Sequence, residues 1–198
     1  MLRNYITVGI RNLVRQKAFS IINILGLSIG LACSIVIILY VRHELSYDSF
    51  NRDAEKIYRI TADAGDLKVA ISPAPMGPTL QSDYTEIKEA VRTTSYSECM
   101  FEVNGQKFDE SRRLYADSNF FNIFQFTFLR GEASTALTPN GIVLTDKIAT
   151  KYFGSEDPIG KVMRMDNSRD LTVTAVIQIP ANSHLQPDFI IPISFIAD

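Results

Sequence analysis

The sequence predicts an α+β protein in which one N-terminal transmembrane helix precedes a mixed α+β domain outside the cytoplasm. No charged side chain lies between Lys17 and Arg42, and the chain after this run alternates between short strand-like and helix-like segments separated by turn residues. All 22 acidic residues follow the run. We expect a cytoplasmic amphipathic helix over residues 1–18, a transmembrane helix over 19–41 and an extracytoplasmic domain over 46–198.

The apolar run from Phe19 to Val41 has 23 residues, and as a helix it would span roughly 35 Å, enough to cross a bilayer. A buried core helix is normally shorter than this. A cleaved signal peptide would have a shorter apolar region, fewer preceding residues and a small-residue cleavage site, none of which this sequence shows. The run is therefore interpreted as a permanent membrane anchor.

Charge predicts the orientation of this anchor. The basic residues before it are Arg3, Arg11, Arg15 and Lys17, and short basic flanks tend to remain in the cytoplasm. The remaining chain holds 16 basic and 22 acidic residues, a formal charge of −6. An acidic domain of this kind is a poor candidate for nucleic-acid binding, which requires a basic face.

The first 18 residues have the pattern of an amphipathic helix at the membrane surface. Leu2, Ile6, Ile10 and Leu13 share one side, and the basic residues named above form a cytoplasmic basic face. This face suits either anchoring to anionic lipid or docking of a cytoplasmic partner.

Three small residues recur every four positions within the span: Gly26, Gly30 and Ser34. Such spacing lets another membrane helix approach closely, although it also arises by chance. We expect this face to pack against a neighbouring transmembrane helix.

The first half of the outer domain gives mixed signals. A β-like run is expected at residues 57–61, and Pro75–Arg92 has a helical pattern of apolar residues. Asn104-Gly105 predicts a hairpin turn, because both central positions of such a turn need positive φ. A short helix at 118–124 and a strand at 126–129 should follow, and Phe120, Phe121, Phe124, Phe126 and Phe128 are expected in the core.

The last third is more regular. A strand is expected at 141–144, followed by a helix that is capped at Thr145 or Asp146 and stopped by Gly154. A structural turn of Asp157, Pro158, Gly160 and Lys161 should lead into a strand at 161–165, and residues 171–179 alternate as a further strand.

The segment from Gly154 to Val162 superficially resembles a phosphate-binding loop. Five residues rather than four separate the glycines, Val162 replaces the hydroxyl that would bind magnesium, and Pro158 interrupts the amides that would bind phosphate. We therefore expect no nucleotide hydrolysis by this chain.

No other catalytic or cofactor pattern is found. The two histidines, His43 and His184, stand in no metal-ligand spacing, and Cys33 and Cys99 cannot form a disulfide within one chain. The adjacent acids Glu156 and Asp157 fit a solvated turn. The expectation is a non-enzymatic chain without metal or cofactor.

Several stretches together resemble the MacB/FtsX-like ABC transporter permeases, namely their N-terminal membrane helix and MacB-like periplasmic core domain. The resemblance lies in LRNYITVGIRNLVRQKAFSIINILGLSIGLA, ELSYDSFNRDAEKIYRI, IVLTDKIATKYFGSEDPIGKVMRM and LTVTAVIQIPANSHLQPDF.

This resemblance implies a non-catalytic permease subunit in the cell inner membrane, with its main domain in the periplasm. Its implied partners are a separate ATP-binding subunit, a second permease subunit in a homodimer or heterodimer, and the lipid bilayer, with a periplasmic adaptor as a further candidate. The expected activity is export or mechanotransmission driven by the partner's ATP hydrolysis. The resemblance also implies that the core domain continues beyond Asp198.

Two other readings stay open at this point. A single-pass membrane-anchored sensor or binding module would need no further membrane spans. A membrane-anchored hydrolase would need convergent catalytic groups, which the sequence does not show.

Overall fold

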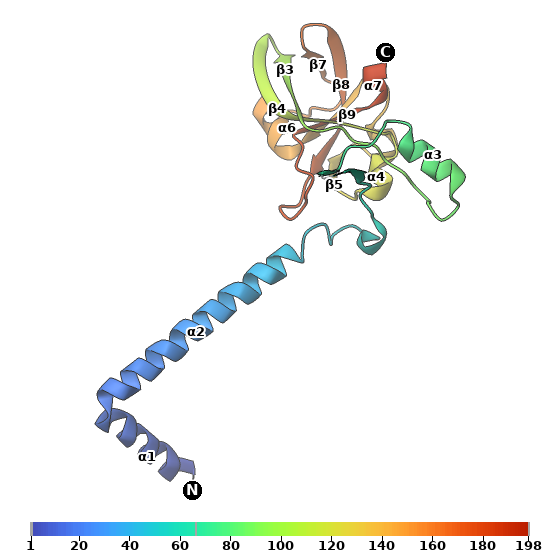
Figure 1. The fold of residues 1–198 in the computed structure, drawn as a ribbon. Helices are drawn as coiled ribbons and strands as arrows, with labels where there is room; N and C mark the ends of the chain where they lie inside the picture. The colour runs from blue at the N-terminus through green and yellow to red at the C-terminus, as the bar shows by residue number, and fades with distance from the viewer. Residues whose placement is uncertain (1, 66, 198) are drawn as a thin grey trace. The chain divides into compact units, whose positions relative to one another are not determined.

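The chain forms two compact units, one that ends at Tyr47 and one that begins at Asp48. A computed structural model describes residues 2–65 and 67–197, and for residues 2, 3, 64, 67, 68 and 197 the backbone alone (Figure 1). The fold is α+β with an apolar N-terminal helix, which confirms the predicted fold class.

The first unit consists of helix α1 (Leu2–Arg15) and helix α2 (Lys17–Glu44). They are separated at Gln16 rather than at residue 18, because Gln16 leaves helical geometry with φ −108° and ψ 60°. The Ser20 hydroxyl donates a hydrogen bond to the Leu13 carbonyl at 3.0 Å and so bridges the break.

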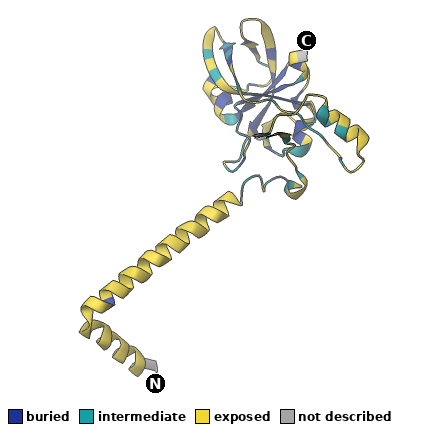
Figure 2. Cartoon of the chain, in the orientation of Figure 1, coloured by how far each residue is buried: buried dark blue, intermediate teal, exposed yellow. Residues whose placement is uncertain are grey.

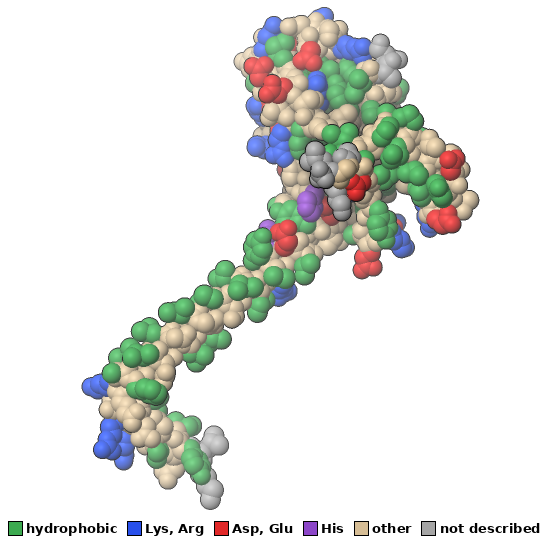
Figure 3. Space-filling model, in the orientation of Figure 1, with side chains coloured by type: hydrophobic (Ala, Val, Ile, Leu, Met, Phe, Trp, Pro, Cys, Tyr) green, Lys and Arg blue, Asp and Glu red, His purple; other side chains and the backbone are tan. Residues whose placement is uncertain are grey.

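Helix α2 is long and apolar enough to cross a membrane, with a mean hydropathy of 2.6 over its most apolar stretch. It exposes its hydrophobic side chains along its length (Figures 2 and 3). Exposing such an apolar surface to water is energetically unfavourable, whereas lipid chains would solvate it.

The second unit is built on a seven-stranded mixed sheet in the order β5-β8-β6-β9-β4-β3-β7. The pairs β6–β8 and β4–β9 are parallel, and the other pairs are antiparallel. The strands are β3 (Ser97–Val103), β4 (Gln106–Ala116), β5 (Thr127–Arg130), β6 (Gly141–Thr145), β7 (Val162–Met165), β8 (Arg169–Gln178) and β9 (Phe189–Pro192).

Strand β7 pairs with β3 and also with the first half of β8, so six strands close into a ring. The second half of β8 binds β5 on the same edge. The remaining elements of this unit are the 3-10 helix Ala54–Lys56, strands β1 (Ala62–Ala64) and β2 (Leu67–Val69), and helices α3 (Met76–Asp83), α4 (Phe120–Ile123), α5 (Ala133–Ala136), α6 (Asp146–Phe153) and α7 (Ser194–Ala197).

Successive side chains of the central strands enter two different cores, because side chains alternate between the two faces of a strand. In β6, Ile142 and Leu144 enter the first core and Val143 enters the second. In β9, Ile190 lies in the second core, between two residues that enter the first. Burial on both faces makes these strands continuously apolar.

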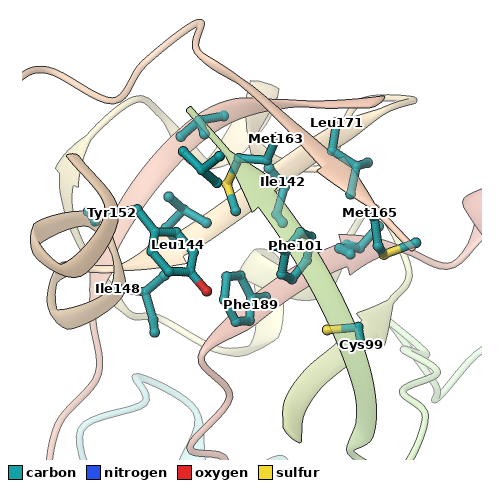
Figure 4. Packing of buried hydrophobic residues seen from close by; sticks show 14 of the residues in the cluster. Cys99, Phe101, Ile142, Leu144, Ile148, Tyr152, Met163, Met165, Leu171 and Phe189 are labelled. Carbon is teal, nitrogen blue, oxygen red and sulfur yellow. The ribbon is translucent and has the colours of Figure 1, made fainter. Parts of the chain in front are cut away.

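The first core lies inside the ring, and α6 contributes to it. Figure 4 shows Phe101 of β3 close to Phe189 of β9, and their ring centroids are 4.5 Å apart. Ile148 and Tyr152 of α6 lie at one side of the cluster. Helix α6 begins as predicted, with the Thr145 hydroxyl accepting a hydrogen bond from the Ile148 amide.

The second core contains the phenylalanines that were expected to be buried. Phe120, Phe121 and Phe126 are buried, and Phe124 and Phe128 pack against them while partly exposed. The Asn104-Gly105 hairpin is also confirmed, because it joins β3 to β4 and both residues have positive φ.

Two element predictions are wrong. Residues 57–61 do not pair as a strand within the described chain. Helix α3 ends at Asp83 instead of Arg92, because the following chain becomes extended to reach the main sheet. There Arg92 binds Asp117 through its main chain and side chain, and Thr93 forms a bridge with Ala116.

Replacement of Gly131 should test the close contact between β5 and β8. Its φ is +73°, and an added Cβ would lie 2.4 Å from the Thr174 carbonyl oxygen. We expect Gly131→Ala to lower the free energy of unfolding by about 3 kcal/mol or more. Gly105 also has positive φ but open space around it, so Gly105→Ala should cost only about 1 kcal/mol. Urea denaturation of the whole chain in detergent, followed by tyrosine fluorescence, would measure both; equal losses would contradict the steric argument.

Candidate functional site

The residues predicted for membrane packing lie along an open face of α2. A Cβ added at Gly26 or Gly30 would meet nothing within 4 Å in the described chain. The Ser34 hydroxyl bonds within its own helix, to the Gly30 carbonyl at 2.9 Å. The face is therefore accessible to another helix, and its packing role stays a prediction.

The predicted basic face is also accessible. Arg11, Arg15 and Lys17 are exposed, whereas the side chain of Arg3 lies outside what the structure describes. Arg15 occupies the last turn of α1, where a cation offsets the negative end of the helix dipole. These side chains are free to face phospholipid or an acidic protein surface.

The residues Asp157, Pro158, Gly160 and Lys161 form a turn that is fastened to β8. Asp157 accepts a hydrogen bond from the Ile159 amide at 3.1 Å, and the Lys161 amide donates to the Pro158 carbonyl at 3.0 Å. Gly160, with φ +79°, donates to the Val173 carbonyl at 2.8 Å.

The Lys161 side chain contacts one residue of helix α6 and one residue of the turn. Its ammonium lies 5.1 Å from the centre of the Phe153 ring and pairs with Glu156. Hydrogen bonding to Lys161 lowers the pKa of the Glu156 carboxyl. This geometry fits a structural role for the turn.

A different set of residues ties the start of the second unit to distant loops. We call this set the linker clasp: Asp48, Asn51, Gln125, Asn182 and His184. The Asp48 carboxylate accepts a hydrogen bond from the His184 amide at 3.0 Å and lies 2.7 Å from His184 Nδ1. The Asp48 amide donates to the Asn182 carbonyl at 2.9 Å. Asp48 thus holds a loop that is 136 positions away in sequence.

Asn51 is the buried centre of the clasp, with 3% of its surface exposed. Its side-chain nitrogen donates to the Asp48 carbonyl at 3.1 Å, and its side-chain oxygen accepts from the Gln125 amide at 3.0 Å. The Gln125 side chain in turn accepts from the Arg52 amide at 3.2 Å. Between these polar contacts, Phe50 stacks on Phe126 of the second core with ring centroids 5.9 Å apart.

The loop that receives Asp48 is itself fixed. Ser183 is buried, and its hydroxyl donates to the Leu185 carbonyl at 2.9 Å. Gln186 donates to the carbonyls of Pro180 and Ser183 through its side chain, and its amide donates to the Tyr96 hydroxyl at 2.7 Å. The loop connects β8 directly to β9, two strands of the ring.

The linker clasp therefore joins the chain at Asp48 and Asn51 to the loops before β9 and β5 through short hydrogen bonds. Sequence reasoning missed it, although it singled out both partner segments, SYDSFN and PANSHLQPDF, for their family resemblance. It treated His184 only as a possible metal ligand or catalytic base. No periodicity or spacing connects residues 48 and 184, so only the fold brings them together.

Two titratable side chains of the first core have raised pKa values, which suits a structural role. Burial raises the pKa of the Cys99 thiol to about 11, although Arg113 partly opposes this. Burial and a hydrogen bond to Glu110 raise the pKa of the Tyr152 hydroxyl. Both groups are neutral at physiological pH. Among the described residues, no group of three or more His, Cys, Asp and Glu residues could hold a metal ion.

An apolar helix long enough to cross a membrane, followed by a mixed α+β sheet domain, is the arrangement of a membrane-anchored protein. Residues 20–197 match the family model for the MacB-like periplasmic core domain. The chain belongs to this family. No curated protein matches it.

Three solved structures are similar to part of this chain. A domain of a protein described as a permease from Porphyromonas gingivalis is 26% identical, with 61% of this chain and 57% of that one covered and a TM-score of 0.51. The periplasmic region of MacB from Actinobacillus actinomycetemcomitans is 17% identical, with coverages of 61% and 54% and a TM-score of 0.47. The extracellular domain of the ABC-type transporter YknZ from Gram-positive bacteria is 15% identical, with coverages of 54% and 55% and a TM-score of 0.43. This chain thus spans little more than half the length of each structure.

Loss of the Asn51 side chain should weaken the linker clasp. Asn51→Ala would leave the Gln125 amide without its acceptor in a buried place, so we expect a loss of about 2 kcal/mol in the free energy of unfolding. The matched control is Asn122→Ala, because the Asn122 side chain is exposed. Urea denaturation in detergent measures both variants, and equal stability would argue against a structural role for Asn51.

The raised pKa of Cys99 should make it unreactive. At pH 8 a thiol with a pKa of about 11 is roughly one-thousandth thiolate, so alkylation by iodoacetamide should be about two orders of magnitude slower than for a free cysteine. The rate should rise about tenfold per pH unit toward pH 11 while the fold persists. Mass spectrometry on a Cys33→Ala background would follow Cys99 alone; rapid labelling at pH 7 would contradict its burial.

Proposed function

We propose that this chain is the membrane subunit of an ABC-type permease that couples ATP hydrolysis by a partner subunit to its periplasmic domain. One observation carries the proposal: the family match begins inside α2 and continues to residue 197, so it joins the membrane helix and the outer domain in one unit. The proposed activity is export or mechanotransmission. In this proposal the chain itself is not an enzyme.

The proposed cellular location is the inner membrane, with the N-terminus in the cytoplasm and the second unit in the periplasm. The four basic residues before the apolar run support this orientation, because cytoplasmic flanks of membrane helices are enriched in Lys and Arg. The acidic character of the remaining chain fits its place outside. In this orientation α1 would lie at the cytoplasmic surface, within reach of an ATP-binding subunit.

The linker clasp supports the mechanical part of the proposal. In this account, movement of the membrane helix pulls on Asp48 through the three residues that follow Glu44. Asp48 and Asn51 then transfer the pull to the loop before β9 and to the turn before β5. Because these bonds join the first residues of the second unit to its loops, a pull on Asp48 would reach the sheet without first unfolding the segment around it.

A second membrane subunit is the proposed neighbour of α2. The open face at Gly26, Gly30 and Ser34 would allow close packing of another helix, in a homodimer or a heterodimer. A periplasmic adaptor is a further proposed partner of the outer domain.

Charge reversal of the basic face should test the cytoplasmic partner. We expect Arg11→Glu, Arg15→Glu and Lys17→Glu together to weaken association with the ATP-binding subunit roughly tenfold, through loss of about three peripheral charge contacts. Native mass spectrometry of the protein extracted from its own membrane in mild detergent would measure the bound subunit. Charge reversal of three exposed basic residues in the outer domain is the matched control: Lys107, Arg130 and Lys147.

Either outcome is informative. Unchanged association in the triple variant would assign the basic face to the bilayer. Complete absence of an ATP-binding subunit from the unaltered protein would overturn the permease proposal and favour the single-pass sensor or binding module.

A further inference from the structure

The bend between helices α1 and α2 lies in a sequence that contains no helix breaker. In Figure 1 the chain changes direction sharply between these two helices, which belong to one compact unit. Residues 10–25 include neither glycine nor proline, and Gln16, Lys17 and Ala18 at the bend are all good helix formers. Local propensity would therefore allow one continuous helix here. A specific contact is needed to hold the bend.

The ladder of backbone hydrogen bonds is interrupted at the bend. In a continuous helix the amides of residues 17–19 would donate to the carbonyls of residues 13–15. No such bond forms among the described residues, because Gln16 departs from helical geometry. Regular bonds remain on both sides, from the Gln16 amide to the Asn12 carbonyl at 3.0 Å and from the Ser20 amide to the Gln16 carbonyl at 3.0 Å. Three carbonyls thus lose their helical partners.

The Ser20 hydroxyl replaces one of these lost partners. It donates to the Leu13 carbonyl, seven positions earlier in the chain, at 3.0 Å. A serine inside a regular helix bonds instead to the carbonyl three or four positions earlier, as Ser34 does with Gly30. Residues seven positions apart in a straight helix are separated by about 10 Å along its axis, which is too far for this bond. The bond therefore forms only in the bent conformation.

Burial also distinguishes Ser20 from its neighbours. With 8% of its surface exposed, it is the only buried residue among the side chains that the structure describes in the first unit. In the proposed topology the bend lies at the membrane boundary, where few water molecules are available and an unpaired carbonyl is costly. A side chain that bonds within an interrupted ladder is a known cause of a sharp helix bend. Ser20 thus stabilises the bent conformation relative to the straight one.

We propose that Ser20 is a positioning residue that fixes the angle between α1 and α2, so that the two helices act as one rigid lever. A force on α1 at the cytoplasmic surface would then tilt or rotate α2 instead of being absorbed at Gln16. The use of this lever in coupling rests on the proposed permease function. The role of Ser20 in holding the bend does not.

A distance between spin labels on the two helices measures the bend. The labels are placed at the exposed positions Asn4→Cys and Ile29→Cys of the whole chain, on a Cys33→Ala background, in vesicles of phosphatidylethanolamine and phosphatidylglycerol. Labelling at pH 7 spares Cys99, whose thiol is buried and protonated. A straight helix would separate the two labelled positions by roughly 38 Å. Pulsed electron paramagnetic resonance should give one narrow distance well below this value, and Ser20→Ala should give a broad distribution that reaches it.

Two further variants isolate the contribution of the hydroxyl. Ser20→Thr keeps the hydroxyl and should restore the narrow distance. Ser28→Ala removes an exposed serine of α2 and should change nothing. A narrow and unchanged distance in Ser20→Ala would overturn the proposal and assign the bend to the bilayer. A broad distribution in the unaltered chain would also overturn it, because the bend would then be flexible.

The natural complex tests the lever. The labelled protein is extracted in mild detergent with its ATP-binding subunit, which is trapped with ADP and vanadate. We expect the distance across the bend to stay constant on trapping when Ser20 is present and to change in Ser20→Ala; a change with Ser20 present would refute the rigid lever. Absence of an ATP-binding subunit would overturn the permease function and the use of the lever in coupling, while the vesicle measurement would still decide the role of Ser20.

Discussion

Strand β8 forms hydrogen bonds along both of its edges, and the second unit depends on this arrangement. One edge binds β6, and the other binds first β7 and then β5. Because β7 also pairs with β3, the sheet closes on itself and a core forms inside the ring. The continuation of β8 past β7 leaves room for β5 and thus for the second core on the outer side. Gly131, packed against the backbone of residues 174 and 175, marks how closely the chain approaches β8 at this point.

The linker clasp connects this ring to the chain that arrives from the membrane helix. Asp48 uses both carboxylate oxygens and its amide, and Asn51 uses both polar atoms of its side chain. The contacted loops lead into β9, a strand of the ring, and into β5, which pairs with β8 outside the ring. Each of these hydrogen bonds contributes little by itself, but they form together because they share one local geometry. Phe50 packs against the second core and holds the segment in place.

The two units are suited to different solvents. Helix α2 presents apolar side chains on all sides, which only lipid or other membrane helices can cover without cost, while the second unit keeps its apolar residues in two interior cores.

The sequence by itself determined the membrane helix, the α+β class, the Asn104-Gly105 hairpin and the Thr145 cap, because hydropathy, periodicity and turn chemistry are local properties. Its resemblance to MacB-like permeases pointed to the correct family. It also indicated the buried phenylalanines, although not which core they occupy. Only the tertiary structure decided that the helix from Met76 ends at Asp83, that residues 57–61 have no strand partner in the described chain, and that Asp48 meets His184. These outcomes depend on contacts between residues far apart in the chain, which no local pattern encodes.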